Sequence, residues 1–176
     1  MFHNKLAVEG ANLHPLGLIT DVVAGAFTGD WVSMAHSERA SMLIYKGSAG
    51  TAGSDPSFTV LQASDNAGTG SKALALDTDR VHKKQAATNL ASTPIFEGAS
   101  ADITSNVITN GTLAEEVALY VIDILPSDLD IANDFTHVSL TIADAGTGSA
   151  QYVAAFMLLA PLRYQGPVAD AHDILA

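Results

Sequence analysis

The pentapeptide Ala-Gly-Thr-Gly-Ser occurs twice in the chain, at Ala67–Ser71 and at Ala145–Ser149. Each copy follows an extended segment that ends near an aspartate, and each precedes an apolar segment. Paired glycines supply the positive φ angles that tight reversals require. Neither copy has the glycine spacing of a P-loop or of a dinucleotide-binding loop. The repeat therefore predicts two tight reversals between extended segments, in a chain organised around antiparallel strands.

Short extended segments follow one another along the chain, and no long amphipathic helix is predicted. Phe135–Ala143 alternates between apolar and polar side chains, which is typical of a half-buried strand. Met42–Tyr45 is apolar at every position, which predicts a strand covered on both faces. About eight to ten short strands with closely spaced turn signals predict an all-β fold, an antiparallel β-sandwich of which the jelly roll is one form.

Tyr152–Leu159 is also apolar on both faces, so it needs two covers. One cover is the partner sheet of the sandwich. The other is either a loop or arm of the same chain or a neighbouring subunit, and the sequence leaves both open. The outward positions are our candidate interface residues, namely Tyr152, Ala154, Phe156 and Leu158.

We predict one domain with an extension at each end. Residues 1–18 lack periodicity and contain Pro15, which predicts an N-terminal arm. Residues 19–165 form the β-sandwich domain, and residues 166–176 form a C-terminal tail after Gly166-Pro167. The two arms are further candidates for contacts with a partner. The first residues lack the apolar run of a signal peptide, and no apolar stretch is long enough for a membrane span, so we expect synthesis in the cytoplasm and no membrane contact.

The chain carries 8 Lys and Arg against 19 Asp and Glu, a formal net charge of −11. This charge repels phosphate and argues against a nucleic-acid partner. Three of the basic residues, Arg80, Lys83 and Lys84, lie close together in the sequence. They indicate either a solvated strand or a docking patch for an acidic partner. The absence of cysteine excludes disulfides, thiolate catalysis and cysteine-based zinc sites.

No group of residues predicts catalysis, a cofactor or a metal, so we expect a protein that is not an enzyme. His36-Ser37-Glu38 contains the residue types of a nucleophilic triad, but three consecutive residues cannot converge on one proton relay. The aspartates between Asp123 and Asp144 lack the spacing of a calcium loop. Trp31 is the only tryptophan available as a platform for sugar binding.

Several segments together resemble a family of small structural proteins of tailed bacteriophages, usually described as virion, decoration or head-stabilising proteins. The resemblance covers most of the chain loosely, and it rests on fold-level patterns at Asn4–Ala7, Ser41–Tyr45, Phe58–Ala63, Gly68–Leu74, Leu119–Asp123, Asp128–Asp130 and Leu162–Tyr164. It implies a capsid decoration or cement protein on the outside of the virion head. The implied partners are the major capsid protein and further copies of the chain, with a homotrimer expected first.

Two other functions remain open on the sequence. The first is another position in the virion, such as a tail or head–tail joining component, because similar folds serve both. The second is a β-sandwich module that binds glycans or calcium. On the decoration hypothesis, Arg80, Lys83 and Lys84 are candidate contacts to an acidic capsid surface.

Overall fold

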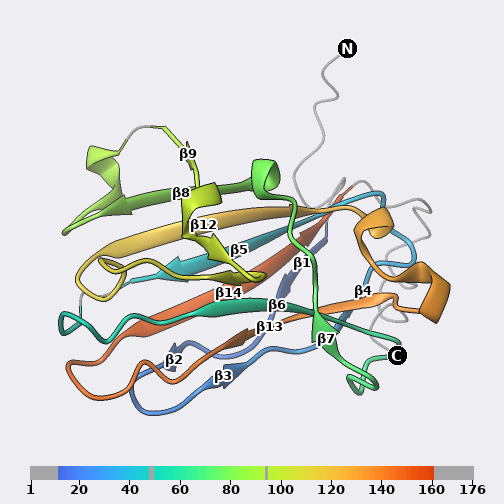
Figure 1. The fold of residues 1–176 in the computed structure, drawn as a ribbon, viewed down its shortest axis with the longest axis horizontal. Helices are drawn as coiled ribbons and strands as arrows, with labels where there is room; N and C mark the ends of the chain where they lie inside the picture. Colours follow the sequence, from blue (N-terminus) through green and yellow to red (C-terminus); the bar gives the residue numbers. More distant parts are fainter. Residues whose placement is uncertain (1–11, 48–49, 94, 161–176) are drawn as a thin grey trace.

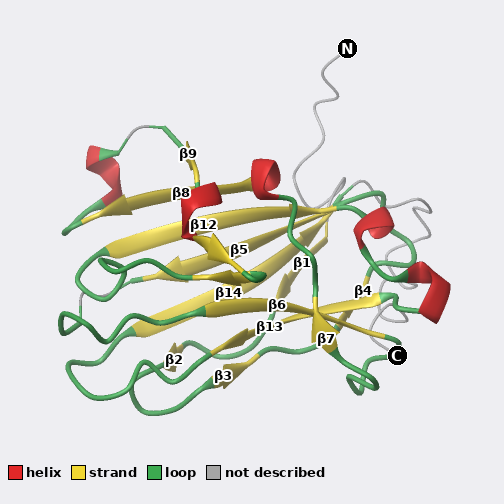
Figure 2. Ribbon diagram, in the orientation of Figure 1, coloured by secondary structure: helices red, strands yellow, loops and turns green. Residues whose placement is uncertain are grey.

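The computed structural model describes residues 12–47, 50–93 and 95–160 of the chain. Two antiparallel β-sheets of seven strands each pack against one another. The remaining regular structure consists of short 3-10 turns between strands, drawn red in Figure 2. They are η1 (Thr78–Arg80), η2 (Leu90–Ser92), η3 (Ser100–Asp102), η4 (Pro126–Asp128) and η5 (Ile131–Asn133). The predicted all-β sandwich is confirmed.

Sheet A has the strand order β1-β14-β5-β12-β8-β9, and β2 also pairs with β14. Figure 1 shows β8, β12, β5 and β14 running side by side across the molecule. The strands of sheet A are β1 (Asn12–Pro15), β2 (Thr20–Asp21), β5 (Ala40–Lys46), β8 (Val81–Ala86), β9 (Glu97–Gly98), β12 (Val117–Ile124) and β14 (Tyr152–Leu159).

Sheet B has the strand order β10-β11-β6-β13-β3, with β4 paired to β13 and β7 paired to β6. Its strands are β3 (Phe27–Thr28), β4 (Val32–Ser33), β6 (Phe58–Ala63), β7 (Lys72–Ala73), β10 (Ile103–Thr104), β11 (Val107–Ile108) and β13 (His137–Ile142). The two central strands, β6 and β13, are paired along their whole length.

The strand pairs are nested in the order of the sequence. β1 pairs with β14, β3 with β13, β5 with β12, and β6 with β7. Successive pairs fall alternately in sheet A and sheet B, which is the topology of a jelly roll. The segment from β8 to β11 is inserted between β7 and β12, and it widens both sheets.

The core lies between the inner faces of the two sheets. Met42 and Ile44 of β5 and Tyr120 of β12 point inward from sheet A and are fully buried. Phe58 of β6 points inward from sheet B, and its ring meets the Tyr120 ring edge to face at 5.6 Å between centroids. Aliphatic side chains supply most of the remaining core, as the low aromatic content of the sequence predicts.

The two copies of the repeated pentapeptide have different positions in the fold. The first lies in a hairpin between β6 and β7, where Leu61 is opposite Ala73, so the predicted reversal is confirmed. The second lies between β13 and β14, which belong to different sheets. The tight reversal predicted here is therefore wrong, because the segment crosses from one sheet to the other. The Ala143 amide donates to the Ser57 carbonyl oxygen next to β6, and the Ala145 amide donates to the Val22 carbonyl oxygen just after β2.

The predicted N-terminal arm is too long at its C-terminal end. Asn12–Pro15 forms the edge strand of sheet A and pairs with Phe156–Leu159 of β14. Leu16 follows it and is completely buried in the core. Backbone pairing in a sheet does not require a periodic sequence over so few residues, which explains the error. Residues 1–11 of the predicted arm and the predicted tail at 166–176 lie outside the described residues.

Candidate interaction surface

The alternation of β14 separates its side chains into two sets. Val153, Ala155, Met157 and Leu159 point into the core and are buried. The other four positions point away from sheet B, and they are the predicted interface residues Tyr152, Ala154, Phe156 and Leu158. Tyr152 is 51% exposed, Phe156 and Leu158 are half-buried, and the small Ala154 is 9% exposed.

The registers of the neighbouring strands extend this outward set across sheet A. Phe156 is opposite Leu43 of β5, and Leu43 is opposite Val121 of β12. The next row holds Ala154, Tyr45 and Leu119. At the sheet edge, Leu13 and Pro15 of β1 stand opposite Leu158 and Phe156. We call the resulting surface the apolar face, and it comprises Leu13, Pro15, Leu43, Tyr45, Leu119, Val121, Tyr152, Ala154, Phe156 and Leu158.

Within the described residues, the apolar face remains partly open to solvent. Leu13 is 57% exposed and Tyr45 is 43% exposed, whereas Leu43, Leu119 and Val121 are half-buried. The sequence predicts that a second element packs against the outward side chains of β14, either from this chain or from a neighbouring subunit. The part of the chain that the structure describes leaves these side chains half-exposed, so it does not supply a complete cover.

The outer face of sheet B has the opposite chemistry. Thr141, Ser139 and His137 point outward from β13, and Thr59 and Leu61 point outward from β6. Ser139 donates a hydrogen bond to the Gly29 carbonyl oxygen at 2.7 Å. Ala63 is the sixth outward position, and both Ala63 and Ser139 are fully buried. Of the four outward side chains that reach solvent, three are polar, namely Thr59, His137 and Thr141. The two outer faces of the sandwich therefore differ: the outer face of sheet A is mainly apolar on β1, β14, β5 and β12, and the outer face of sheet B is mainly polar where it reaches solvent.

Charged groups lie at the margin of the apolar face. Asp123 lies at the end of β12, where it accepts a hydrogen bond from Ser41 and lies 3.6 Å from the Arg39 guanidinium. On β8, His82 is opposite Val121 and Lys84 is opposite Leu119. The Lys84 ammonium lies over the Phe96 ring, 4.7 Å from its centroid. The centre of the face, at Leu43 and Phe156, is free of charge.

The predicted basic cluster is engaged within the chain. Arg80 donates two hydrogen bonds to the Asp128 carboxylate, at 2.8 and 2.9 Å, and a third to Asp77 at 2.8 Å. These bonds stabilise the guanidinium and raise the pKa of Arg80. Its two carboxylate partners come from the same chain, so Arg80 is a structural link between η1 and η4. The role of the cluster in binding an acidic surface stays a prediction.

Lys83 points to the opposite side of β8 from Lys84 and enters a partly buried polar network. Its ammonium donates to Asp102 at 2.6 Å, and the Tyr120 hydroxyl donates to the same carboxylate oxygen at 2.7 Å. The Asn110 amide adds a third bond at 3.1 Å. Burial raises the pKa of Asp102, but these hydrogen bonds outweigh burial and hold the pKa below its usual value.

Burial raises the pKa of Tyr120, and the neighbouring Asp102 carboxylate, to which the hydroxyl donates, raises it further. The tyrosine therefore stays a neutral hydrogen-bond donor at all physiological pH values. A neutral donor and a satisfied ion pair hold β8, η3 and β12 together.

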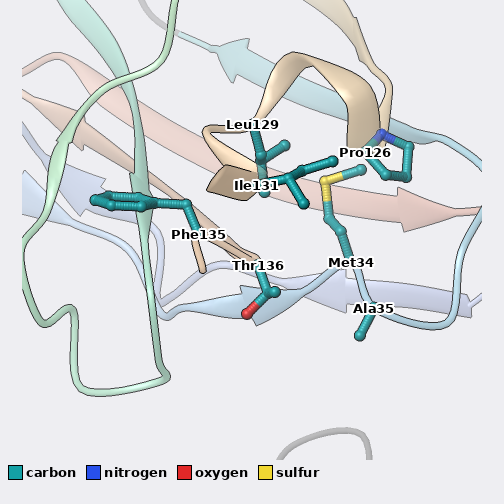
Figure 3. A pocket seen from close by; sticks show the side chains of 7 residues that line it. All are labelled: Met34, Ala35, Pro126, Leu129, Ile131, Phe135 and Thr136. Atoms are coloured by element: carbon teal, nitrogen blue, oxygen red, sulfur yellow. The ribbon is translucent and has the colours of Figure 1, made fainter. Parts of the chain in front are cut away.

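An apolar pocket of about 270 Å³ opens at one end of the molecule, where the connection from β12 to β13 crosses β4 (Figure 3). Figure 3 shows Leu129, Ile131 and Pro126 gathered near Met34, with Thr136 on the opposite side. Among the side chains that line the pocket, only that of Thr136 is polar. Its hydroxyl donates a hydrogen bond to the Ser64 carbonyl oxygen. The pocket offers space for an apolar group but no reactive one.

The residues named for calcium and glycan binding are separated in the structure. Asp128 pairs with Arg80, and Asp130 pairs with Lys72, so these carboxylates have cationic partners already. Across the described residues, no three His, Asp or Glu side chains gather as metal ligands. Trp31 is half-buried, and a Cβ atom on Gly68 would lie 2.6 Å from its indole nitrogen. The indole thus packs against the first repeated turn.

Sequence reasoning found the β14 part of the apolar face but not its full width. Leu43 and Tyr45 lie in the apolar run that predicts a strand covered on both faces, and that run was the available signal for them. No outward role was predicted for Leu119 and Val121. The contribution of β1 lacked such a signal, because its four residues are too few for a pattern.

In the described residues, no helix has the length and apolar character needed to span a membrane. Comparison of the sequence with known protein families and with characterised proteins found no match.

Proposed function

We propose that the protein is a bacteriophage capsid decoration or cement protein, which binds the outside of the head and stabilises contacts between capsomers. The observation that carries this proposal is the apolar face. A jelly roll whose outer face on β1, β14, β5 and β12 consists mostly of Leu, Val, Phe and Tyr has a surface suited to permanent assembly.

Two further properties support an assembly role. Jelly rolls recur among viral capsid proteins, which is support by fold analogy. The surface carries few charges, since Asp, Glu, Lys and Arg make up 15% of the chain, and contacts that bury few ions are less costly. The ion pairs of Lys83 with Asp102 and of Arg80 with Asp128 join separate elements within the chain.

The major capsid protein is the proposed partner, and the particle surface is the proposed location. Many weak contacts repeated by symmetry give strong total binding, so a cement protein needs only a modest affinity for each site. A tail or head–tail joining component would use the same kind of surface, but it would be present in few copies per particle.

Cosedimentation with purified empty capsids that lack the protein tests the proposal. We expect binding to saturate at a fixed multiple of the number of capsomers. Binding of only a handful of copies per particle would instead place the protein at the tail or at the head–tail joint. Failure to cosediment at any protein concentration would contradict a role in decoration.

A further inference from the structure

His14 is a buried histidine on the edge strand of sheet A. β1 pairs with β14 alone, and His14 is opposite the core residue Met157, so its ring points inward. The side chain is 8% exposed, whereas its neighbours Leu13 and Pro15 are exposed. Its Nε2 atom is buried, and within the described residues this atom has no hydrogen-bond partner. An ionisable group is thus buried on a strand that pairs with a single neighbour.

The buried position of the ring opposes protonation. An imidazolium carries an N–H group on both ring nitrogens, so the buried Nε2 atom would become a donor without an acceptor. A buried donor without an acceptor and a buried charge without a partner both cost free energy. Burial accordingly lowers the pKa of His14 below 6.5. The ring therefore binds a proton readily only after it has reached solvent.

No neighbouring charge in the described part of the chain offsets this cost. The inward residues of β14 around the register position of His14 are Ala155, Met157 and Leu159, which are apolar. Burial is the single influence on the pKa of His14, so none of the surrounding ionisable groups stabilises the imidazolium. The ionisable residues on the elements that adjoin β1 are Asp21, Asp30, His36, Glu38, Arg39 and Tyr152.

The contacts that follow β1 confine any release of the strand to its own four residues. Within β1, Pro15 lacks an amide hydrogen and cannot donate to a neighbouring strand. Leu16 comes directly afterwards and is fully buried. The Leu16 amide donates to the Ala155 carbonyl oxygen at 2.9 Å, and the Leu16 carbonyl oxygen accepts from the Asp30 amide at 2.7 Å. Leu16 therefore anchors the chain in the sandwich when Asn12–Pro15 detaches.

We propose that β1 is an acid-sensitive latch, which protonation of His14 releases from the edge of sheet A. In neutral solution the unprotonated ring stays buried and β1 stays paired with β14. Below pH 6.5 the released strand binds a proton that the paired strand does not bind. The released population therefore grows by up to about tenfold for each pH unit of acidification.

Release of β1 leaves Phe156–Leu159 of β14 without a neighbour at this edge of the sheet. An unpaired strand edge is the place where an extended segment of another chain adds to a sheet. The latch thus controls when this edge becomes available. It goes beyond the proposed function, and it operates whether or not the protein binds a capsid.

Hydrogen–deuterium exchange of the full chain, read by mass spectrometry at pH 7.5 and pH 5.5, tests the latch. After correction for the pH dependence of chemical exchange, peptides that cover β1 should exchange up to about tenfold faster at pH 5.5. Peptides that cover β5 and β12 should not change. His14→Gln keeps a neutral polar side chain at both pH values and should abolish the acceleration. The matched control is His82→Gln on β8 of the same sheet, which should retain it.

His14→Phe is the second variant if His14→Gln fails to fold, because an apolar ring has no proton to bind. Acceleration that persists in a folded His14 variant would overturn the inference. So would an unmodified protein in which β1 does not accelerate, or one in which β5 and β12 accelerate as much as β1. NMR titration of the unmodified protein adds a direct reading, since the His14 imidazole should titrate below pH 6.5. Titration at or above that value would contradict the latch.

Discussion

Lys46 is the most unusual single residue in the core. It occupies an inward position at the end of β5 and is 1% exposed. Its ammonium donates to the carbonyl oxygens of Ala114 at 2.9 Å and Glu116 at 2.8 Å. Burial lowers its pKa from 10.5 to about 8, although nearby carboxylates, including Asp55, favour the charged form. The fold thus bears the cost of a charge in a poorly solvated position.

This lowered pKa predicts that the protein becomes more stable in mildly alkaline solution. Between pH 8 and pH 10.5 the folded chain releases the Lys46 proton while the unfolded chain still holds it. The unfolding free energy therefore rises with pH across this window, by an amount on the order of 2 kcal/mol. Urea unfolding at a series of pH values measures the effect. Lys46→Met is the control, and an equal rise in that variant would refute the assignment.

The adjacent residues Lys83 and Lys84 should differ sharply in their contribution to stability. Lys83→Met leaves the Asp102 carboxylate, which is 7% exposed, without its cation, and we expect a loss of about 3 kcal/mol. Lys84→Met removes an exposed contact with the Phe96 ring and should cost less than about 1 kcal/mol. Urea unfolding at pH 7 compares the two variants. Equal losses would show that the Asp102 network does not stabilise the fold.

At the scale of elements, the repeated pentapeptide shows what local sequence can and cannot predict. Both copies contain glycines with positive φ, namely +77° at Gly68 and +66° at Gly70 in the first copy and +85° at Gly146 in the second. The tight reversal at the first copy was predictable, because it depends on local turn chemistry. The pairing of the strands that flank each copy was not predictable. β13 and β14 do not pair with each other, because each pairs with strands that are distant in the sequence.

The different surroundings of the two copies lead to a matched prediction. Gly146→Ala forces a side chain into a left-handed conformation with open space around it, which should cost about 1 kcal/mol. Gly68→Ala adds the same backbone strain and also places a Cβ atom 2.6 Å from the Trp31 indole nitrogen. We expect a clearly larger loss of stability for Gly68→Ala.

Trp31 is the only tryptophan, so its fluorescence reports directly on the first turn. The emission spectrum of the folded Gly68→Ala variant should shift as the indole is displaced, while that of Gly146→Ala should match the unmodified protein. Unchanged emission and equal stability losses in the two variants would contradict the packing of the indole on Gly68.

For the whole molecule, the sequence predicted the fold class and the outward residues of β14, because alternation is a local property of a strand. It did not predict that β1, β5 and β12 would align their outward residues with those of β14. Registers such as Phe156 opposite Leu43 depend on the nested pairing of distant strands. The basic cluster shows the same limit, since the pairing of Arg80 with Asp128 joins residues 48 positions apart.

The proposed assembly role requires that the outer face of sheet A, and not that of sheet B, makes the contact with a partner. Hydroxyl-radical footprinting of the protein free in solution and bound to empty capsids tests this directly. We predict strong protection of Tyr45, Tyr152 and Phe156 on the apolar face, and no change at His137 and Leu61 on the outer face of sheet B. Equal reactivity of Tyr45, Tyr152 and Phe156 in both samples would contradict the claim, as would protection confined to sheet B.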